Sequence, residues 1–298
     1  MQAFDSAPML PREHVNDRLN FAPQRKPKPR RRTAFNLVVL GFVTGSVFLL
    51  GTAWNLSRSR KLRILSESVF QTALADTFSP AKLQLLSSKL VTVFRENTPF
   101  PHVVIDDFID PKLIKLVQEE IKGQKYEETC AKAYAKTKDK FSTQDFVCFY
   151  KDAVDEENES KKMQVHAERY MGIYTRFLFL LLKSSAFTSF LEDLSGIKDL
   201  MPDPHFLGSG IHSTSRKGFL RVHADFNRYA RYKLDRRLNV FLFLNPDWQE
   251  EWGGALELWP MNMSRCESRI LPMANRLVIF RTTDFSYHGY TDPIQSPF

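Results

Sequence analysis

The chain has 298 residues, 43% of them hydrophobic, which is enough for one large folded domain or two small ones. Its formal net charge of +8 is concentrated near the N-terminus: residues 1–33 hold eight Lys or Arg and three acids, and Arg58, Arg60, Lys61 and Arg63 add four positive charges. The rest of the chain carries 30 basic and 31 acidic residues, a net charge of −1, so net basicity gives no argument for nucleic-acid binding by the folded part. Nucleic acid is therefore not an expected partner.

Residues 34–54 form an uncharged segment that predicts a membrane-spanning helix. Its 21 residues, at a rise of about 1.5 Å each, cover the bilayer's hydrocarbon thickness of about 30 Å. A buried core helix would show a polar face, and a signal peptide would not follow 33 residues that include Asp5 and Glu13. Seven Lys or Arg lie shortly before the segment and four shortly after it, which favours a cytoplasmic N-terminus. We therefore expect a single-pass type II protein with a disordered basic tail over 1–33 and its folded domain in the lumen of the ER or Golgi.

After the predicted anchor, the sequence pattern predicts mainly helices first and mainly strands later. Residues 55–98 predict a helical stalk, with apolar residues at helical spacing between 61 and 95 that could pack back on the domain. His102–Asp106 predicts a strand, and Asp110-Pro111 predicts the start of a helix. Residues 152–162 predict a polar surface loop, Tyr174–Leu182 a buried helix, and Phe187–Leu194 a helix that ends at Gly196.

Short β-rich runs follow one another from residue 202 onward. They are Gly218–His223, Leu238–Leu244, Ala255–Trp259 and Arg276–Phe280. Regularly spaced short strands with turn residues between them are typical of an antiparallel sandwich or jelly roll. The sequence therefore predicts an α+β protein whose C-terminal part is a β sandwich.

Two histidines and one aspartate in this β-rich part form a candidate metal-ligand set. Side chains alternate along a strand, so His223 and Asp225 point to the same side of theirs. His288 follows the predicted strand 276–280 and could complete the set from a neighbouring strand. Two imidazoles and one carboxylate are the facial ligand set of non-haem Fe(II) oxygenases. The tripeptide alone is a weak signal, because a histidine at a strand end is more often simply hydrogen-bonded.

Several longer motifs occur in the same order as in one known family. They are Pro99-Phe-Pro-His-Val-Val-Ile-Asp-Asp-Phe108, Gly218-Phe-Leu-Arg-Val-His-Ala-Asp-Phe-Asn227, Arg237-Leu-Asn-Val-Phe-Leu-Phe-Leu-Asn-Pro-Asp-Trp248, Glu251-Trp-Gly-Gly-Ala-Leu-Glu-Leu-Trp259, Asn275-Arg-Leu-Val-Ile-Phe280 and Ser286-Tyr-His-Gly289. Over residues 99–298 the chain resembles the iron- and 2-oxoglutarate-dependent oxygenases of the prolyl 4-hydroxylase superfamily, in particular the branch related to ribosomal-protein prolyl hydroxylases.

The resemblance implies a fold, a cofactor set and a reaction. The fold would be a double-stranded β-helix, or jelly roll, with flanking helices. His223, Asp225 and His288 would bind Fe(2+), with 2-oxoglutarate and O2 as co-substrates and ascorbate as an expected reductant. The reaction would yield a hydroxylated product, succinate and CO2. Asn239 and Phe241 share one face of a predicted strand and are expected to line the co-substrate pocket; no catalytic residue beyond the metal ligands is predicted.

One element of the family pattern has no counterpart before Phe298. Family members carry a basic residue, usually Arg, about a dozen positions after the second histidine, where it pairs with the distal carboxylate of 2-oxoglutarate. We expect a chain truncated at its C-terminus and lacking the last strand, which would leave a sheet edge unpaired. Arg237 or Arg281 could substitute, although a surface or strand-end arginine is the simpler interpretation of each.

Three functions follow from these observations. The first is hydroxylation of prolyl residues in a protein or peptide substrate by an enzyme anchored through a single membrane helix. The second is a catalytically inactive, iron-binding or interaction protein that lacks the co-substrate arginine. The third is hydroxylation of a small molecule or lipid, because a fold does not fix the substrate.

Overall fold

The computed structural model describes residues 67–126, 128, 141–143, 146–148, 159–165, 168–203, 206 and 209–297. The predicted basic tail, the predicted membrane anchor at 34–54 and residues 55–66 lie outside the described residues. Within the described part of the chain, no helix combines the length and the apolar character needed to cross a membrane.

Two antiparallel sheets form the centre of the fold. The larger sheet has the order β10 (Ser268–Ile270), β9 (Leu256–Trp259), β12 (Tyr287–Tyr290), β5 (Ile211–His223), β4 (Glu159–Val165), β3 (Phe146–Cys148) and β2 (Phe141–Thr143). The smaller sheet has the order β1 (His102–Ile105), β11 (Leu277–Arg281) and β8 (Leu238–Leu242). A short hairpin of β6 (Arg228–Tyr229) and β7 (Leu234–Asp235) precedes β8. Mixed helices and antiparallel sheets were predicted, and the arrangement is consistent with a jelly roll.

Strand β11 shows how the sequence separates two apolar layers. Leu277 and Ile279 belong to a core shared with the helices, whereas Val278 and Phe280 pack with Leu258 of the larger sheet. All five side chains are buried. A strand covered on both faces reads as a continuous apolar run, as Leu277–Phe280 does. The inner faces of the two sheets thus meet around Phe280, and the outer face of the smaller sheet is covered by helices.

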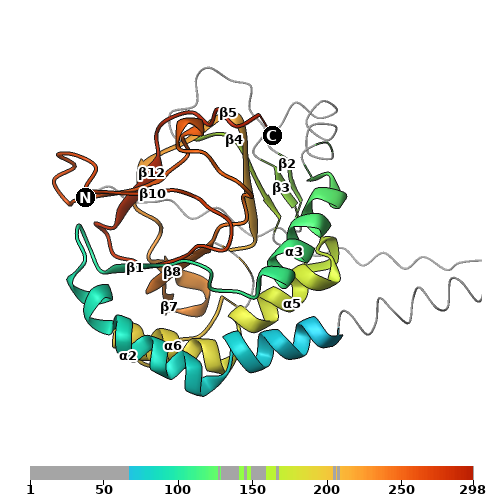
Figure 1. Ribbon diagram of the computed structural model, residues 1–298. Helices are drawn as coiled ribbons and strands as arrows, with labels where there is room; N and C mark the ends of the chain where they lie inside the picture. Colours follow the sequence, from blue (N-terminus) through green and yellow to red (C-terminus); the bar gives the residue numbers. More distant parts are fainter. Residues whose placement is uncertain are drawn as a thin grey trace, which may run out of the picture. The chain divides into compact units, whose positions relative to one another are not determined.

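Helices pack along one side of the sheets, as Figure 1 shows. Among the described residues they include α2 (Pro80–Glu96), α3 (Pro111–Gln124), α5 (Ile173–Leu182) and α6 (Ser185–Ser195). Asp110 caps α3 by accepting a hydrogen bond from the Lys112 amide at 2.7 Å, with Pro111 at the first turn, as predicted. Gly196, with φ 72°, ends α6 as predicted, because a glycine adopts this left-handed conformation without strain.

Three predicted elements differ from the structure. The helical pattern between 61 and 95 is interrupted, because the π-helical turn η1 (Ala73–Thr77) ends before α2 begins at Pro80. Residues 159–162, expected to be a loop, open strand β4, since their backbone pairs with β5 despite their polar side chains. Helix α5 buries one face only, and Leu180 is 64% exposed. The π-helical turn and α2 bury Ala73, Leu83 and Phe94 in the helix-side core, so the segment predicted as a stalk packs on the domain.

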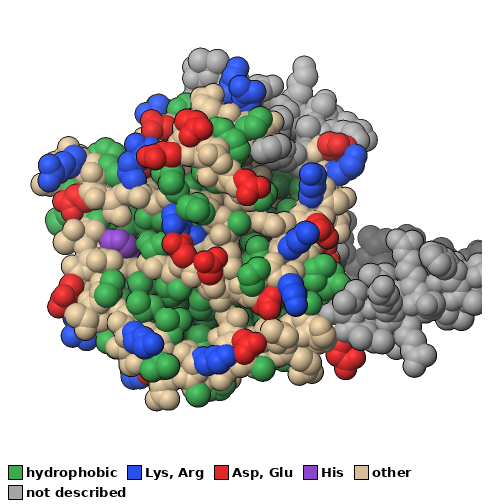
Figure 2. All heavy atoms as spheres, in the orientation of Figure 1, with side chains coloured by type: hydrophobic (Ala, Val, Ile, Leu, Met, Phe, Trp, Pro, Cys, Tyr) green, Lys and Arg blue, Asp and Glu red, His purple; other side chains and the backbone are tan. Residues whose placement is uncertain are grey.

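Strand β8 of the smaller sheet and strand β5 of the larger sheet frame the site described below. Among the described strands, β8 has β11 as its one neighbour in the sheet. On the larger sheet, the Ile294 amide donates to the Gly218 carbonyl at 2.9 Å, and the Lys217 amide donates back to the Ile294 carbonyl. The residues that follow β12 therefore lie along β5. On the face drawn in Figure 2, basic and acidic side chains are interspersed across the described surface.

Candidate metal centre

Strands β5 and β12 bring the two predicted histidine ligands together. They pair antiparallel with His288 directly opposite His223, and Asp225 follows two residues after the end of β5. Gly289 makes this approach feasible, because a Cβ at this position would lie 2.8 Å from the Leu220 carbonyl oxygen. The glycine after His288 is therefore required for β12 to sit close against β5.

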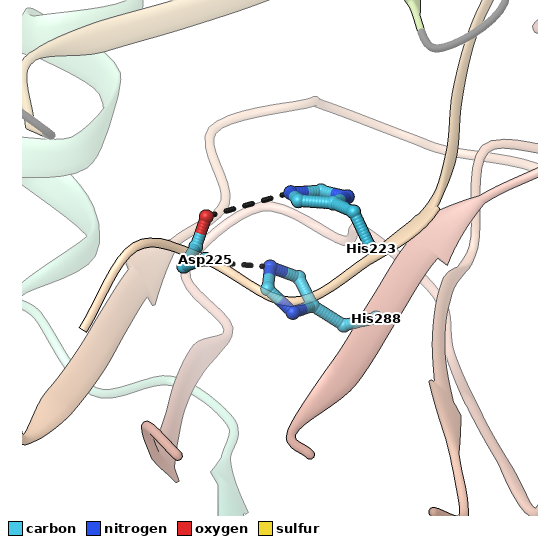
Figure 3. A group of neighbouring side chains, drawn as sticks. All are labelled: His223, Asp225 and His288. Atoms are coloured by element: carbon cyan, nitrogen blue, oxygen red, sulfur yellow. Dashed lines mark ion pairs between the residues drawn. The ribbon is translucent and has the colours of Figure 1, made fainter. Parts of the chain in front are cut away.

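The three predicted ligands converge on one point (Figure 3). One potential ligand atom from each of them lies within 4.8 Å of the other two. His223 Nε2 is 3.4 Å from Asp225 Oδ1, and His288 Nε2 is 3.5 Å from Asp225 Oδ2. The side chain of His288 is almost fully buried, whereas that of His223 is 35% exposed. The cluster is thus closed on the His288 side and open toward His223.

Backbone contacts set the tautomer of both imidazoles. His223 Nδ1 lies 2.9 Å from the Arg221 carbonyl oxygen, and His288 Nδ1 lies 3.0 Å from that of Ser286. A carbonyl oxygen can only accept, so each Nδ1 carries the hydrogen and donates it. In the neutral ring, each Nε2 then presents a lone pair toward Asp225. Metal-binding histidines in proteins show this same arrangement, in which a partner of one ring nitrogen orients the other toward the ion.

The electrostatic environment suits ligation by these three groups. Burial lowers the pKa of His288 to about 4, so this imidazole is neutral at pH 7. Burial opposes ionisation of Asp225, but contacts with His223, Arg236 and Asn239 outweigh it and hold the pKa of the carboxyl well below its usual range. For His223, burial is outweighed by the contacts with Asp225 and the Arg221 carbonyl, which raise the pKa of the ring. His223 is therefore the group whose proton competes most with a metal ion.

We expect metal affinity to fall in acid at a pH set by His223. Because the pKa of His223 is raised above its ordinary value of 6.5, its protonated form begins to accumulate above that pH. Each ion bound then displaces one proton, so affinity should drop about tenfold per pH unit below the His223 pKa. The Kd for Mn(II), measured by calorimetry between pH 8 and pH 5.5, checks this expectation. A Kd that stays constant over this range would contradict ligation by His223.

Asn239 and Phe241, expected near the co-substrate, lie on the inner face of β8 beside the triad. Asn239 Nδ2 donates to Asp225 Oδ2 at 2.6 Å. The Phe241 ring centroid lies 6.2 Å from that of His288, and the Phe280 centroid lies 4.8 Å from it. The smaller sheet thus contributes one hydrogen bond to the carboxylate and an aromatic wall against the buried imidazole.

The structure adds Arg236, which the sequence analysis did not select. Its Nη2 lies 3.3 Å from Asp225 Oδ2. Arg237, one of the two arginines suggested from the sequence, is exposed. Neither Arg237 nor Arg281 forms an ion pair with the triad among the described residues. Strand alternation offered no signal for Arg236: extended back from β8, it would place Arg237 on the face of Asn239 and Phe241, but both arginines lie between β7 and β8.

Residues 209–297 match the model of the 2OG-Fe(II) oxygenase superfamily. The matched segment contains His223, Asp225 and His288 and runs from the start of β5 through β12. This segment of the chain therefore matches a 2OG-Fe(II) oxygenase domain, the domain of 2-oxoglutarate-dependent dioxygenases.

Three solved structures were found to be similar to the chain, each with a TM-score below 0.5. One is a prolyl hydroxylase from Trichoplax adhaerens in complex with a peptide fragment of the hypoxia inducible factor oxygen degradation domain. It is 16% identical in sequence with a TM-score of 0.44, and the match covers 75% of this chain and 90% of that chain. A prolyl-4-hydroxylase from Pseudomonas putida is 18% identical with a TM-score of 0.38, over 69% and 91%. A prolyl 4-hydroxylase from Phytophthora capsici is 19% identical with a TM-score of 0.42, over 74% and 62%. No curated protein matches the sequence.

Proposed function

We propose that the protein hydroxylates prolyl residues of a protein or peptide substrate, using Fe(II) held by His223, Asp225 and His288. One observation carries the metal assignment: both histidines donate through Nδ1 to a backbone carbonyl and direct Nε2 toward one ionised carboxylate. This donor set fits Fe(II), because two neutral imidazoles and a carboxylate leave other coordination positions open. The prolyl substrate is supported by the sequence resemblance over residues 99–298.

The residues of the chain would supply binding, orientation and exclusion of water. Bound iron, 2-oxoglutarate and O2 supply the oxidising chemistry that converts a substrate C–H bond to an alcohol and releases succinate and CO2. Asn239 Nδ2 donates a hydrogen bond to Asp225 Oδ2, and this bond fixes the rotation of the Asp225 carboxylate. Phe241 and Phe280 flank His288 and exclude water from the inner side of the site. The more exposed His223 marks the side from which a polypeptide would enter.

The proposal is tested by measuring turnover of the full chain. Purified protein is incubated with Fe(II), 2-oxoglutarate and ascorbate, with and without a proline-rich peptide, and succinate and the mass of the peptide are followed. We expect peptide-stimulated succinate formation and the addition of one oxygen atom to a prolyl residue. Asp225→Ala, which removes one predicted ligand, should abolish both signals.

The same measurement separates the alternatives. Succinate formation without any oxidised proline would favour a small-molecule or lipid hydroxylase. Stoichiometric metal binding with no succinate under any condition would favour an inactive, iron-binding interaction protein. The absence of metal binding would contradict the assignment of the triad itself.

A further inference from the structure

The hairpin segment, residues 226–237, is rooted at the candidate metal centre. It contains β6, the turn η3 (Ala230–Tyr232) and β7. At its root the Arg236 amide donates to the Asn227 carbonyl at 2.8 Å, and Arg236 Nη2 lies 3.3 Å from Asp225 Oδ2. Since the segment starts directly after Asp225, both of its ends meet at the carboxylate of the triad.

The hairpin segment is basic, whereas the rest of the domain is acidic. It holds five Lys or Arg and one Asp, a net charge of +4. The chain outside residues 1–33 and the four cations at 58–63 carries a net charge of −1, which leaves −5 for everything there except the hairpin segment. Arg236 is engaged with Asp225, and Asp235 lies opposite Arg228 across the hairpin. Positive charge is therefore concentrated beside the triad.

Three cations of the hairpin segment are available to bind a ligand. Arg228, Lys233 and Arg237 are exposed, and within the described part of the chain none of their side chains forms an ion pair or a hydrogen bond. Arg228 follows Asp225 by three residues, so their Cα atoms lie no more than about 11 Å apart. An extended polypeptide covers that distance in about three residues. Carboxylates within about three residues of a side chain held at the metal can therefore reach this surface.

The distribution of charge favours a short acidic stretch of polypeptide over a nucleic acid. A nucleic acid is negative along its whole length, so it would meet the net negative charge of the rest of the domain. It would also meet Asp284, which accepts a hydrogen bond from Asn227 at the root of the hairpin segment. A polypeptide can place its carboxylates only where the three cations lie.

We propose that the hairpin segment selects polypeptide substrates that carry acidic residues within about three positions of the target residue, through Arg228, Lys233 and Arg237. This inference rests on the proposed function, which leaves the residues around the target open. An exposed ion pair changes affinity by only about 1.4- to 5-fold, so the preference arises from several pairs acting together.

The test measures peptide binding to the full chain loaded with Mn(II) and 2-oxoglutarate, without turnover. Three fluorescent peptides share one proline-rich core and carry Glu, Gln or Lys at the flanking positions, and fluorescence anisotropy gives each Kd. We expect the Glu peptide to bind about tenfold more tightly than the Gln peptide, and the Lys peptide to bind more weakly than both. The ratio of the Glu and Gln Kd values should approach one in 1 M salt, where the Debye length is about 3 Å.

Paired variants locate the preference on the hairpin segment. Lys233→Gln combined with Arg237→Gln should bring the Kd values of the Glu and Gln peptides to within about threefold of each other. Lys89→Gln combined with Lys115→Gln removes the same charge from exposed positions of α2 and α3, and should leave the wild-type preference intact. Lys233→Arg combined with Arg237→Lys keeps both charges, so it should retain the preference and separate loss of charge from disturbance of the hairpin.

Other results would overturn the assignment. If the wild type binds the Glu and Gln peptides equally and hydroxylates both, the inference fails and the proposed function stands. If the α2–α3 control loses the preference to the same extent, the preference reflects only the net charge of the domain. Displacement of the Glu peptide by a lower concentration of single-stranded DNA, with the same dependence on Lys233 and Arg237, would assign the hairpin segment to nucleic acid. If no peptide binds or stimulates succinate formation although Mn(II) binds, the proposed function fails and the inference with it.

Discussion

Replacing His288 by Ala is expected to lower the affinity of the protein for Mn(II) by more than about 100-fold, because the loss of a second-sphere partner alone costs about 10- to 100-fold. His288 is the most buried member of the triad, and its Nε2 faces Asp225 at 3.5 Å. Water can replace the lost imidazole as a ligand, but it is a weaker donor and is not held in place by the backbone. Calorimetric titration of Mn(II) into the purified variant gives the Kd.

His102 provides a matched control for this substitution. It is also a buried histidine whose Nδ1 lies 2.9 Å from the carbonyl oxygen two residues earlier, but it lies in β1 outside the triad. His102→Ala should therefore lower stability while leaving the Mn(II) affinity of the folded protein within about threefold of wild type, because among the described contacts the His102 side chain meets Phe100 and no triad residue. Similar losses of affinity in the two variants would mean that His288 supports the fold and does not ligate the metal.

Replacing Phe280 by Ala should produce the largest loss of stability near the site, about 3–5 kcal/mol, as for other fully buried aromatic residues. The side chain is fully buried between the two sheets. Its ring centroid lies 5.8 Å from that of Phe100, 5.5 Å from Phe241 and 4.8 Å from His288. Urea unfolding of the metal-free protein at pH 7 measures the change in the free energy of unfolding.

Phe285 serves as the control for Phe280. It is close to His288 in sequence but 46% exposed, so Phe285→Ala should change the free energy of unfolding by no more than about 0.5 kcal/mol. Because the Phe280 ring also packs on His288, Phe280→Ala should weaken Mn(II) binding as well. A small effect of Phe280→Ala on stability would show that the two sheets do not depend on this contact for their packing.

Local sequence patterns predicted the elements whose formation depends on neighbouring residues. The start of α3 follows from Asp110-Pro111, because a capping side chain and a proline act within one turn. The strands at 238–242, 256–259 and 277–281 follow from short apolar runs between turn residues. Strand β4 was missed because its first residues are polar and pair with residues of β5 that lie about 60 positions further along the chain.

The sequence alone predicted the candidate metal ligands, two histidines and an aspartate, although β5 ends at His223 and Asp225 lies just beyond it. It also predicts the anchor at 34–54, which remains a prediction. Only the tertiary structure decided what surrounds the triad. The register of β12 on β5 sets His288 opposite His223, and the packing of the two sheets brings Asn239 onto Asp225. The contact of Arg236 with Asp225 likewise depends on how the segment between β7 and β8 packs beside the triad. These contacts join residues that are distant in sequence, and local propensity does not encode such contacts.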